Sequence, residues 1–270
     1  MATDRAFRDQ PRLAAYDVLR AVSADDAYAN LVLPQVLRDR GLGGRDAALA
    51  TELVGGTLRG QGTYDAILAE CTDRPLGKVE AKVLDALRLG THQLLAMRVP
   101  GHAAVATTVD LVRHRVGHRP AGFVNAILRK VSAHDLDGWV RRVAPDPTGH
   151  LAVATSHPRW VVEALATALG RPGELDALLA ADNERPRVTL VARPGLSTVA
   201  ELGGRPTLSP LGVTLKASLF PLCSTVWGRS VSSRGALPVS CLPSPSPLPD
   251  LYGRRERRPS GGLGSVWFRF

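Results

Sequence analysis

The sequence predicts an all-α domain, followed by a short αβ fragment and a disordered or irregular carboxyl-terminal tail. Up to about residue 185, apolar residues recur at three- and four-residue spacing, which keeps one face of each helix toward a core. The β-branched segment Val188–Ala192 then predicts a strand. Beyond Gly203, neither the helical nor the strand period persists. The predicted parts are residues 8–145, 146–204 and 205–270.

The first quarter of the chain predicts four helices, because apolar residues follow the helical period there and glycines interrupt it. The expected helices are Leu13–Val22, Leu31–Leu37, Asp46–Arg59 and Thr63–Cys71. Gly60 and Gly62 separate the third helix from the fourth. Thr63 carries a hydroxyl group typical of a helix N-cap, so it is expected to begin the fourth helix.

Five further helices are expected before residue 185. They are Val79–Met97, His102–Val116, Ala121–Val131, Pro158–Leu169 and Gly173–Ala181. Pro158 suits the first turn of a helix, where its missing N–H costs no hydrogen bond. Residues 132–157 form only a polar stretch between two of these helices. Gly56, Gly90 and Gly122 are expected to allow close approach between neighbouring helices.

The tail differs from the rest of the chain in composition. Residues 205–270 are rich in Ser, Pro, Gly and Arg, and the segment PVSCLPSPSPLPD holds five prolines in thirteen residues. Proline lacks the N–H group that helices and central strands need. Two explanations remain open: a natural disordered tail, or translation of a GC-rich gene in a shifted reading frame. We favour the second.

Charge and cysteine content narrow the class of protein. The net charge is +9, but residues 205–270 hold nine Lys and Arg against two Asp and Glu, which leaves +2 for residues 1–204. A nucleic-acid partner must therefore be argued from local clusters of cations. No membrane-spanning apolar run or signal-peptide core is present, and the three cysteines are widely spaced. These features predict a cytoplasmic protein with no membrane partner.

Four segments resemble the Sun/RsmB family of bacterial ribosomal-RNA cytosine-C5 methyltransferases. They are LATELVGGTLRGQGTYDAIL (Leu49–Leu68), LRLGTHQLLAMRVPGHAAVATTVDLVRHRVGHRPAGFVNAILRKV (Leu87–Val131), SHPRWVVEAL (Ser156–Leu165) and NERPRVTLVARPG (Asn183–Gly195). The resemblance covers about residues 10–204, in order. It implies that residues 8–145 form a NusB-like RNA-binding helical bundle, followed by linker helices and the start of a small pre-catalytic domain.

The family's catalytic motifs have no counterpart in this sequence. An S-adenosylmethionine loop similar to LCAGPGGK is absent, as are the PCS-type and TCS-type cysteine motifs. GGLG (Gly261–Gly264) follows no predicted strand, and neither Cys223 nor Cys241 has a neighbouring group that would lower its pKa. We therefore expect no catalytic or cofactor-binding residue in this chain. S-adenosylmethionine is the cofactor of the full-length family.

Clusters of arginine and lysine are the candidate RNA contacts, because cations bind phosphate. The candidates are Arg8, Arg12, Arg20, Arg113, Arg115, Arg119, Arg129 and Lys130. For several of them a structural role is an open alternative, since cations at the end of a helix also complement its dipole. His114 and His118 have a zinc-like spacing but lack a paired motif, so no metal is expected.

Three functions remain in competition on the sequence alone. The favoured one is the RNA-binding amino-terminal part of a 16S ribosomal-RNA cytosine-C5 methyltransferase, present without its catalytic domain and expected to act as a monomer on small-subunit RNA. Without that domain, the chain is expected to transfer no methyl group. The alternatives are a stand-alone NusB-like transcription antitermination factor and an enzyme with an unrecognised active site. No constellation of residues supports the last of these.

Overall fold

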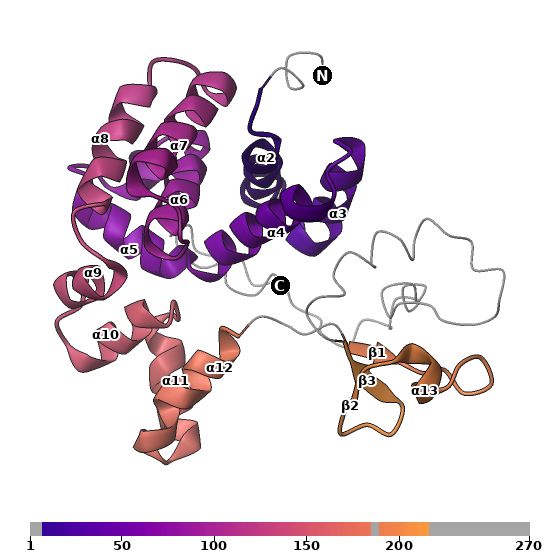
Figure 1. Ribbon diagram of the computed structural model, residues 1–270. Coiled ribbons are helices and arrows are strands. Elements are labelled where there is room, and N and C mark those ends of the chain that lie inside the picture. The colour runs from indigo at the N-terminus through magenta and orange to yellow at the C-terminus, as the bar shows by residue number, and fades with distance from the viewer. Residues whose placement is uncertain (1–6, 185–188, 216–270) are drawn as a thin grey trace, which may run out of the picture. The chain divides into compact units, whose positions relative to one another are not determined.

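The computed structural model describes residues 7–184 and 189–215, which fall into two compact units (Figure 1). The first unit is entirely helical and the second is a small αβ unit. This confirms the predicted order of an all-α domain followed by an αβ fragment. The predictions made for the tail beyond residue 215, including those for Cys223, Cys241 and Gly261–Gly264, lie outside the described residues.

The helical unit follows the predicted series of helices closely at most positions. Its elements are α2 (Gln10–Asp25), α3 (Ala29–Asp39), α4 (Gly44–Arg59), α5 (Gln61–Cys71), the short 3-10 helix η1 (Leu76–Lys78), α6 (Ala81–Leu95), α7 (Gly101–Arg115), α8 (Ala121–Val131), α9 (Leu136–Val143), α10 (Pro147–Ala154), α11 (Arg159–Leu169), η2 (Pro172–Glu174) and α12 (Leu175–Asp182). Helix α8 has the predicted bounds.

The predicted start of the fourth helix was wrong. Helix α5 begins two residues earlier, with Gly60 as its N-cap, so Thr63 lies inside the helix. The Thr63 hydroxyl donates to the carbonyl oxygen of Val153 at 2.5 Å, and the Thr63 N–H donates to Ser156 Oγ at 3.2 Å. Thr63 therefore joins α5 to the carboxyl-terminal end of α10 instead of capping its own helix.

Two short helices lie in the stretch that showed only polar character. Each is begun by an aspartate: the Asp135 carboxylate accepts from the N–H of Gly138 at 2.8 Å, and that of Asp146 accepts from Gly149 at 2.9 Å. An aspartate N-cap satisfies backbone donors that would otherwise lack partners. Helix α9 buries two adjacent residues and α10 buries only one, so neither shows an apolar period, whereas the two caps were a usable signal.

Helix α6 is the centre of the main core. It packs against α2, α4, α5, α7 and α8, and its Leu87 and Leu89 are fully buried although they lie on different sides of the helix. A helix with neighbours on several sides is expected to be apolar around most of its circumference. A second, smaller core joins α10, α11 and α12 through Ala152, Val162, Leu175 and Leu179.

Two of the three glycines expected at helix contacts do lie at such contacts. A Cβ atom on Gly56 of α4 would stand 2.2 Å from the His92 ring of α6, and one on Gly90 would stand 2.8 Å from Leu128 of α8. Atoms at these separations overlap, so both positions require glycine for the helices to approach as they do. Gly122 was wrongly included, since a Cβ atom there meets nothing within 4 Å.

The αβ unit is a three-stranded antiparallel sheet with one short helix. Strand β1 (Thr189–Val191) pairs with β3 (Gly212–Thr214), which pairs in turn with β2 (Arg205–Pro206), and α13 (Val199–Leu202) lies between β1 and β2 in sequence. In the first pair, Leu190 is opposite Val213. The boundary predicted at residue 205 from composition therefore falls inside this sheet. Strands β2 and β3 were not predicted because they are too short to show a period.

Cys71, at the end of α5, is expected to resist alkylation in the folded protein. It is 2% exposed, and burial raises the pKa of its thiol to about 11, although Lys130 acts in the opposite sense. Only the thiolate reacts, so a pKa raised from 9.0 lowers its rate about 100-fold at pH 8. Iodoacetamide labelling followed by peptide mass spectrometry, with and without urea, checks this; equal rates at Cys71 in both conditions would contradict it.

Candidate nucleic-acid interface

The candidate cations of α2 differ in how far they are free to bind a ligand. Arg12 is held at the start of the helix: its side chain binds the Asp9 carboxylate at 2.7 Å and the Gln93 side-chain oxygen of α6 at 2.6 Å. The Arg12 side chain is only 13% exposed. Arg8, which precedes the helix, is exposed. The structure therefore gives Arg12 an internal role and leaves Arg8 accessible.

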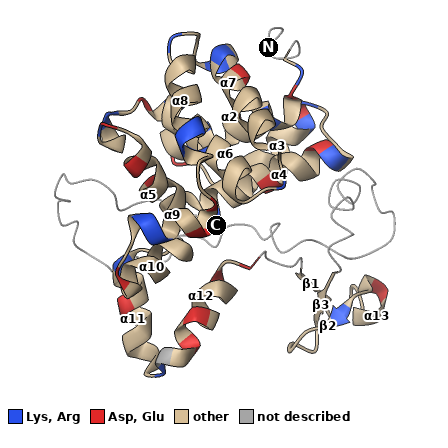
Figure 2. Cartoon of the chain, turned by 60° about the vertical axis from the view of Figure 1, so that its left-hand side comes forward, with Lys and Arg blue, Asp and Glu red and all other residues tan. Residues whose placement is uncertain are grey.

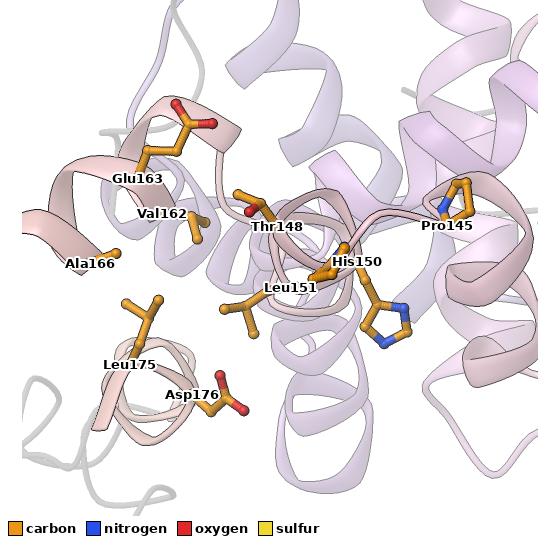
Figure 3. Close-up of a pocket in the computed structure, with 10 residues that line it drawn as sticks. Pro145, Thr148, His150, Leu151, Val162, Glu163, Ala166, Leu175 and Asp176 are labelled. Carbon is orange, nitrogen blue, oxygen red and sulfur yellow. The ribbon is translucent and has the colours of Figure 1, made fainter. Parts of the chain in front are cut away.

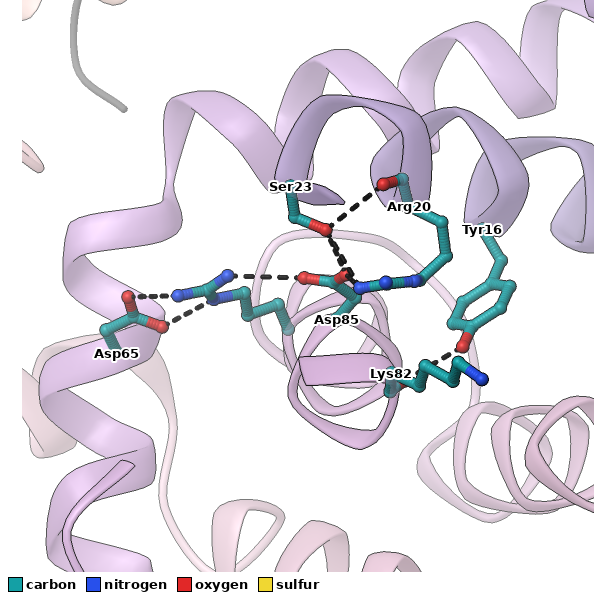
Figure 4. A network of polar contacts seen from close by, with 7 residues as sticks. Tyr16, Arg20, Ser23, Asp65, Lys82 and Asp85 are labelled. Atoms are coloured by element: carbon teal, nitrogen blue, oxygen red, sulfur yellow. Dashed lines mark hydrogen bonds and ion pairs between the residues drawn. The ribbon is translucent and has the colours of Figure 1, made fainter. Parts of the chain in front are cut away.

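Arg20 belongs to a polar network around Asp85 of α6 (Figure 4). The Asp85 side chain is 4% exposed and accepts from Arg20 at 2.6 Å and from the Ser23 hydroxyl at 2.5 Å. On its other side lies Arg88, at 3.3 Å, which also binds Asp65 of α5 through two contacts of 2.7 Å. The network thus ties α2, α5 and α6 together.

Two pKa values reflect the burial of this region. Burial by itself lowers the pKa of Arg88, but its hydrogen bonds with Asp65 and the nearby carboxylate of Asp85 outweigh that effect and raise the pKa. Burial raises the pKa of Tyr16, whose hydroxyl donates to the Lys82 carbonyl oxygen at 2.9 Å. Arg88 therefore stays charged and Tyr16 stays neutral, which makes the network a fixed structural element.

An aromatic stack brings the two ends of the candidate set together. The Phe7 ring, just before α2, stacks on the His114 ring near the end of α7, with centroids 4.8 Å apart and planes inclined by 19°. Close by, the Asp17 carboxylate of α2 binds both Arg115 of α7 and Arg40 after α3. Residues 106 positions apart in the chain, such as Arg8 and His114, are thereby gathered at one end of the bundle.

The cations at this end form what we call the α2–α7 basic surface, made of Arg8, Arg113, Arg119 and Arg115, the last of which is held by Asp17. Arg113 is half exposed and pairs with Asp110, which is also exposed, at 2.8 Å. Arg119 is exposed in the turn between α7 and α8. Figure 2 marks the lysines and arginines of the helical unit in blue. Such cations, beside an aromatic stack, are able to bind phosphate groups.

Arg129 and Lys130 lie apart from that surface, at the other end of α8. Eight residues of helix separate Arg129 from Ala121, which is about 12 Å along the axis. The Lys130 ammonium donates to the carbonyl oxygen of Cys71 at 3.1 Å and lies 3.9 Å from the Asp73 carboxylate. The structure therefore splits the predicted candidates into two separate groups of cations.

Sequence reasoning missed the carboxylates that decide which arginines are accessible. Asp85 and Arg88 are the two charged residues of the stretch VLDALRL, and their place among apolar residues was a usable signal of a buried ion pair. Asp17 gave no such signal, because a polar residue on a surface helix is ordinary. Phe7 was also missed, since it precedes the helix and has no place in its period.

The part of the chain that the structure describes has no residues arranged to bind a metal ion or S-adenosylmethionine. No group of three or more His, Cys, Asp and Glu side chains there has a metal-binding arrangement. An S-adenosylmethionine cradle of the Rossmann kind needs a glycine-rich turn between a parallel strand and a helix. The described strands are antiparallel and α13 has four residues, so the group does not fit here. Nor is any helix among residues 7–184 and 189–215 long and apolar enough to cross a membrane.

These features define a small helical-bundle domain with cations gathered at its ends. Residues 9–133 match the model of the NusB family. The predicted NusB-like fold is thereby confirmed. The solved structure of PH0851 supports the fold alone: it has a TM-score of 0.61 and 14% identity, and the match covers 78% of this chain and 49% of that one.

Curated relatives carry methyltransferase names. Rv1407 of Mycobacterium tuberculosis, named provisionally as a methyltransferase, is 52% identical over 199 residues, which is 72% of this chain and 44% of the relative. The ribosomal RNA small subunit methyltransferase B of Pseudomonas syringae pv. tomato is 34% identical over 67% of this chain and 38% of its own length. The predicted resemblance to that methyltransferase family is confirmed. The chain spans less than half the length of these relatives.

Proposed function

We propose that this chain is the RNA-binding part of a ribosomal-RNA small-subunit cytosine-C5 methyltransferase. The observation that carries the proposal is the extent of the similarity. The match to Rv1407 runs over 199 residues, whereas the NusB family model ends at residue 133. A stand-alone antitermination factor needs only the NusB domain, so it leaves the additional shared residues without a reason. The methyltransferase assignment accounts for both parts.

In this proposal, the chain holds the enzyme on small-subunit ribosomal RNA in the cytoplasm and acts as a monomer. Phosphate groups would bind Arg8, Arg113 and Arg119, whose side chains are the least committed to internal partners. Phosphate contacts fix the position of a protein on RNA without reading its sequence. The methyl donor and the transfer step belong to the part of the relatives that this chain does not match.

The test is RNA binding by the full chain, measured by fluorescence anisotropy with labelled fragments of small-subunit ribosomal RNA. Reversing two charges, with Arg113→Glu and Arg119→Glu together, is expected to weaken binding at least about tenfold near 0.1 M salt. The slope of log affinity against log salt is expected to become shallower by about one for each phosphate group that the variant no longer binds. Both arginines are accessible, so the variant is expected to keep its fold.

Arg171→Glu is the matched control, because Arg171 is 74% exposed and lies beyond α11, away from the α2–α7 basic surface. It changes the net charge by as much as each single reversal does, and it is expected to leave the affinity within about twofold. Equal weakening by the control and by Arg113→Glu or Arg119→Glu alone would show that only net charge matters. Unchanged affinity in the double variant would overturn the proposed surface.

A further inference from the structure

Helices α10, α11 and α12 line an open groove of about 480 Å³ (Figure 3). Its floor is apolar and consists of Leu151 from α10, Val162 and Ala166 from α11, and Leu175 from α12. Val162 and Leu175 also belong to the small core of these helices, so the floor is fixed by packing. The volume lies within the roughly 300–1,000 Å³ of clefts that bury an organic group.

The rim of the groove is acidic. Glu163 and Asp176 line it from α11 and α12, and no lysine or arginine is among its lining residues. Residues 145–184 carry six carboxylates against two arginines, in a chain whose net charge is +9. Both arginines are already paired: Arg159 with Asp146 at 2.9 Å and with Glu163 at 3.0 Å, and Arg171 with Glu174 at 3.0 Å.

A large aromatic side chain stands uncovered beside this rim. Trp160 is 64% exposed and lies one helical turn before Glu163, so the two side chains are neighbours on the surface of α11. Tryptophan is enriched among residues that anchor protein–protein contacts, because it buries a large area at low entropic cost. The groove therefore offers an apolar floor, a carboxylate rim and an aromatic neighbour.

We propose that this groove docks a basic peptide segment of a partner protein, one that inserts apolar side chains and surrounds them with Lys or Arg. Charge complementarity selects this occupant: although Glu163 shares Arg159 with Asp146, carboxylates outnumber cations around the groove, so phosphate groups of RNA are repelled, whereas ammonium and guanidinium groups are attracted. The helical unit would then hold RNA through its α2–α7 basic surface and a cationic protein segment through α10–α12. The docking proposal stands independently of the RNA proposal.

The experiment uses two labelled helical peptides that share a leucine at every third or fourth position. One carries Lys at the remaining positions and the other carries Glu. Titrated with the full chain, the Lys peptide is expected to bind at least about tenfold more tightly than the Glu peptide. Reversing the rim with Glu163→Lys and Asp176→Lys is expected to abolish that preference. Trp160→Ala is expected to weaken the binding of the Lys peptide at least about threefold.

Glu80→Lys is the matched control, since Glu80 is exposed, precedes α6 and does not line the groove. It is expected to leave the preference within about twofold, and circular dichroism of every variant checks the fold. Equal binding of both peptides, or no binding of the Lys peptide, would overturn the proposal. So would a loss of preference in the control as large as that in the rim variant.

Discussion

Replacing Asp85 with alanine is expected to lower the free energy of unfolding by about 3 kcal/mol. Removing one partner of a buried ion pair typically costs about 3–5 kcal/mol, because the remaining charge keeps its desolvation cost without its partner. The lower end applies here, since Arg20 and Arg88 are 21% and 16% exposed and Arg88 keeps Asp65. For a domain of this size the melting temperature would fall by about 6–12 °C.

Asp110→Ala is the matched control for that measurement. Asp110 forms the same kind of contact, with Arg113 at 2.8 Å, but the two side chains are 60% and 50% exposed. Exposed ion pairs typically contribute less than about 1 kcal/mol, so this variant is expected to unfold almost as the parent does. Urea denaturation of both variants gives the comparison. If Asp85→Ala is no less stable than Asp110→Ala, the network in Figure 4 does not stabilise the bundle.

Contacts between helices explain why the accessibility of the candidate cations was hard to predict. Arg8, Arg12 and Arg20 look alike in the sequence, since each is a cation in or before the first helix. Arg12 and Arg20 differ from the exposed Arg8 in the side chain that each binds on α6. Gln93 lies 81 positions from Arg12 in the sequence, and Asp85 lies 65 positions from Arg20. Helical periodicity records which face of one helix is buried, but it does not record which residues of two helices meet.

The fold was far more predictable than the site, for a physical reason. Longer helices such as α4 and α8 bury a continuous apolar stripe, and its residues recur in the sequence at the helical spacing. The short helix α9 buries two adjacent residues and α10 buries one, so neither shows a helical period, and β2 and β3 have only two and three residues. The groove between α10, α11 and α12 depends on those short elements and was therefore not foreseen.

Gly56→Ala is expected to destabilise the protein, although alanine is the better helix former. In an ordinary helix this change stabilises by up to about 1 kcal/mol. At Gly56 the new methyl group would stand 2.2 Å from Cε1 and 2.3 Å from Nε2 of His92. That ring is 3% exposed, and its Nδ1 lies 2.8 Å from the Tyr64 hydroxyl, so it has little freedom to move away. Overpacking of this kind typically costs about 1–3 kcal/mol.

The neighbouring glycine provides a control of opposite sign. A Cβ atom on Gly55 meets only the flexible end of Arg59, at 3.2 Å, so Gly55→Ala is expected to raise the free energy of unfolding by up to about 1 kcal/mol. Urea denaturation of the two variants therefore gives shifts in opposite directions. Stabilisation by Gly56→Ala would show that α4 and α6 are not in close contact there.

Removing the obstructing ring tests whether the clash is the cause. In a His92→Ala background the space beside α4 is open, so adding Gly56→Ala is expected to cost nothing or to stabilise by up to about 1 kcal/mol, as at any helix interior. The two changes are thus coupled by about 1–3 kcal/mol, a value that a double-mutant cycle measures directly. Additive effects would mean that Gly56 is needed for a reason other than the approach of α4 to His92. Strong coupling would instead show that glycine is required because Gly56 of α4 contacts His92 of α6.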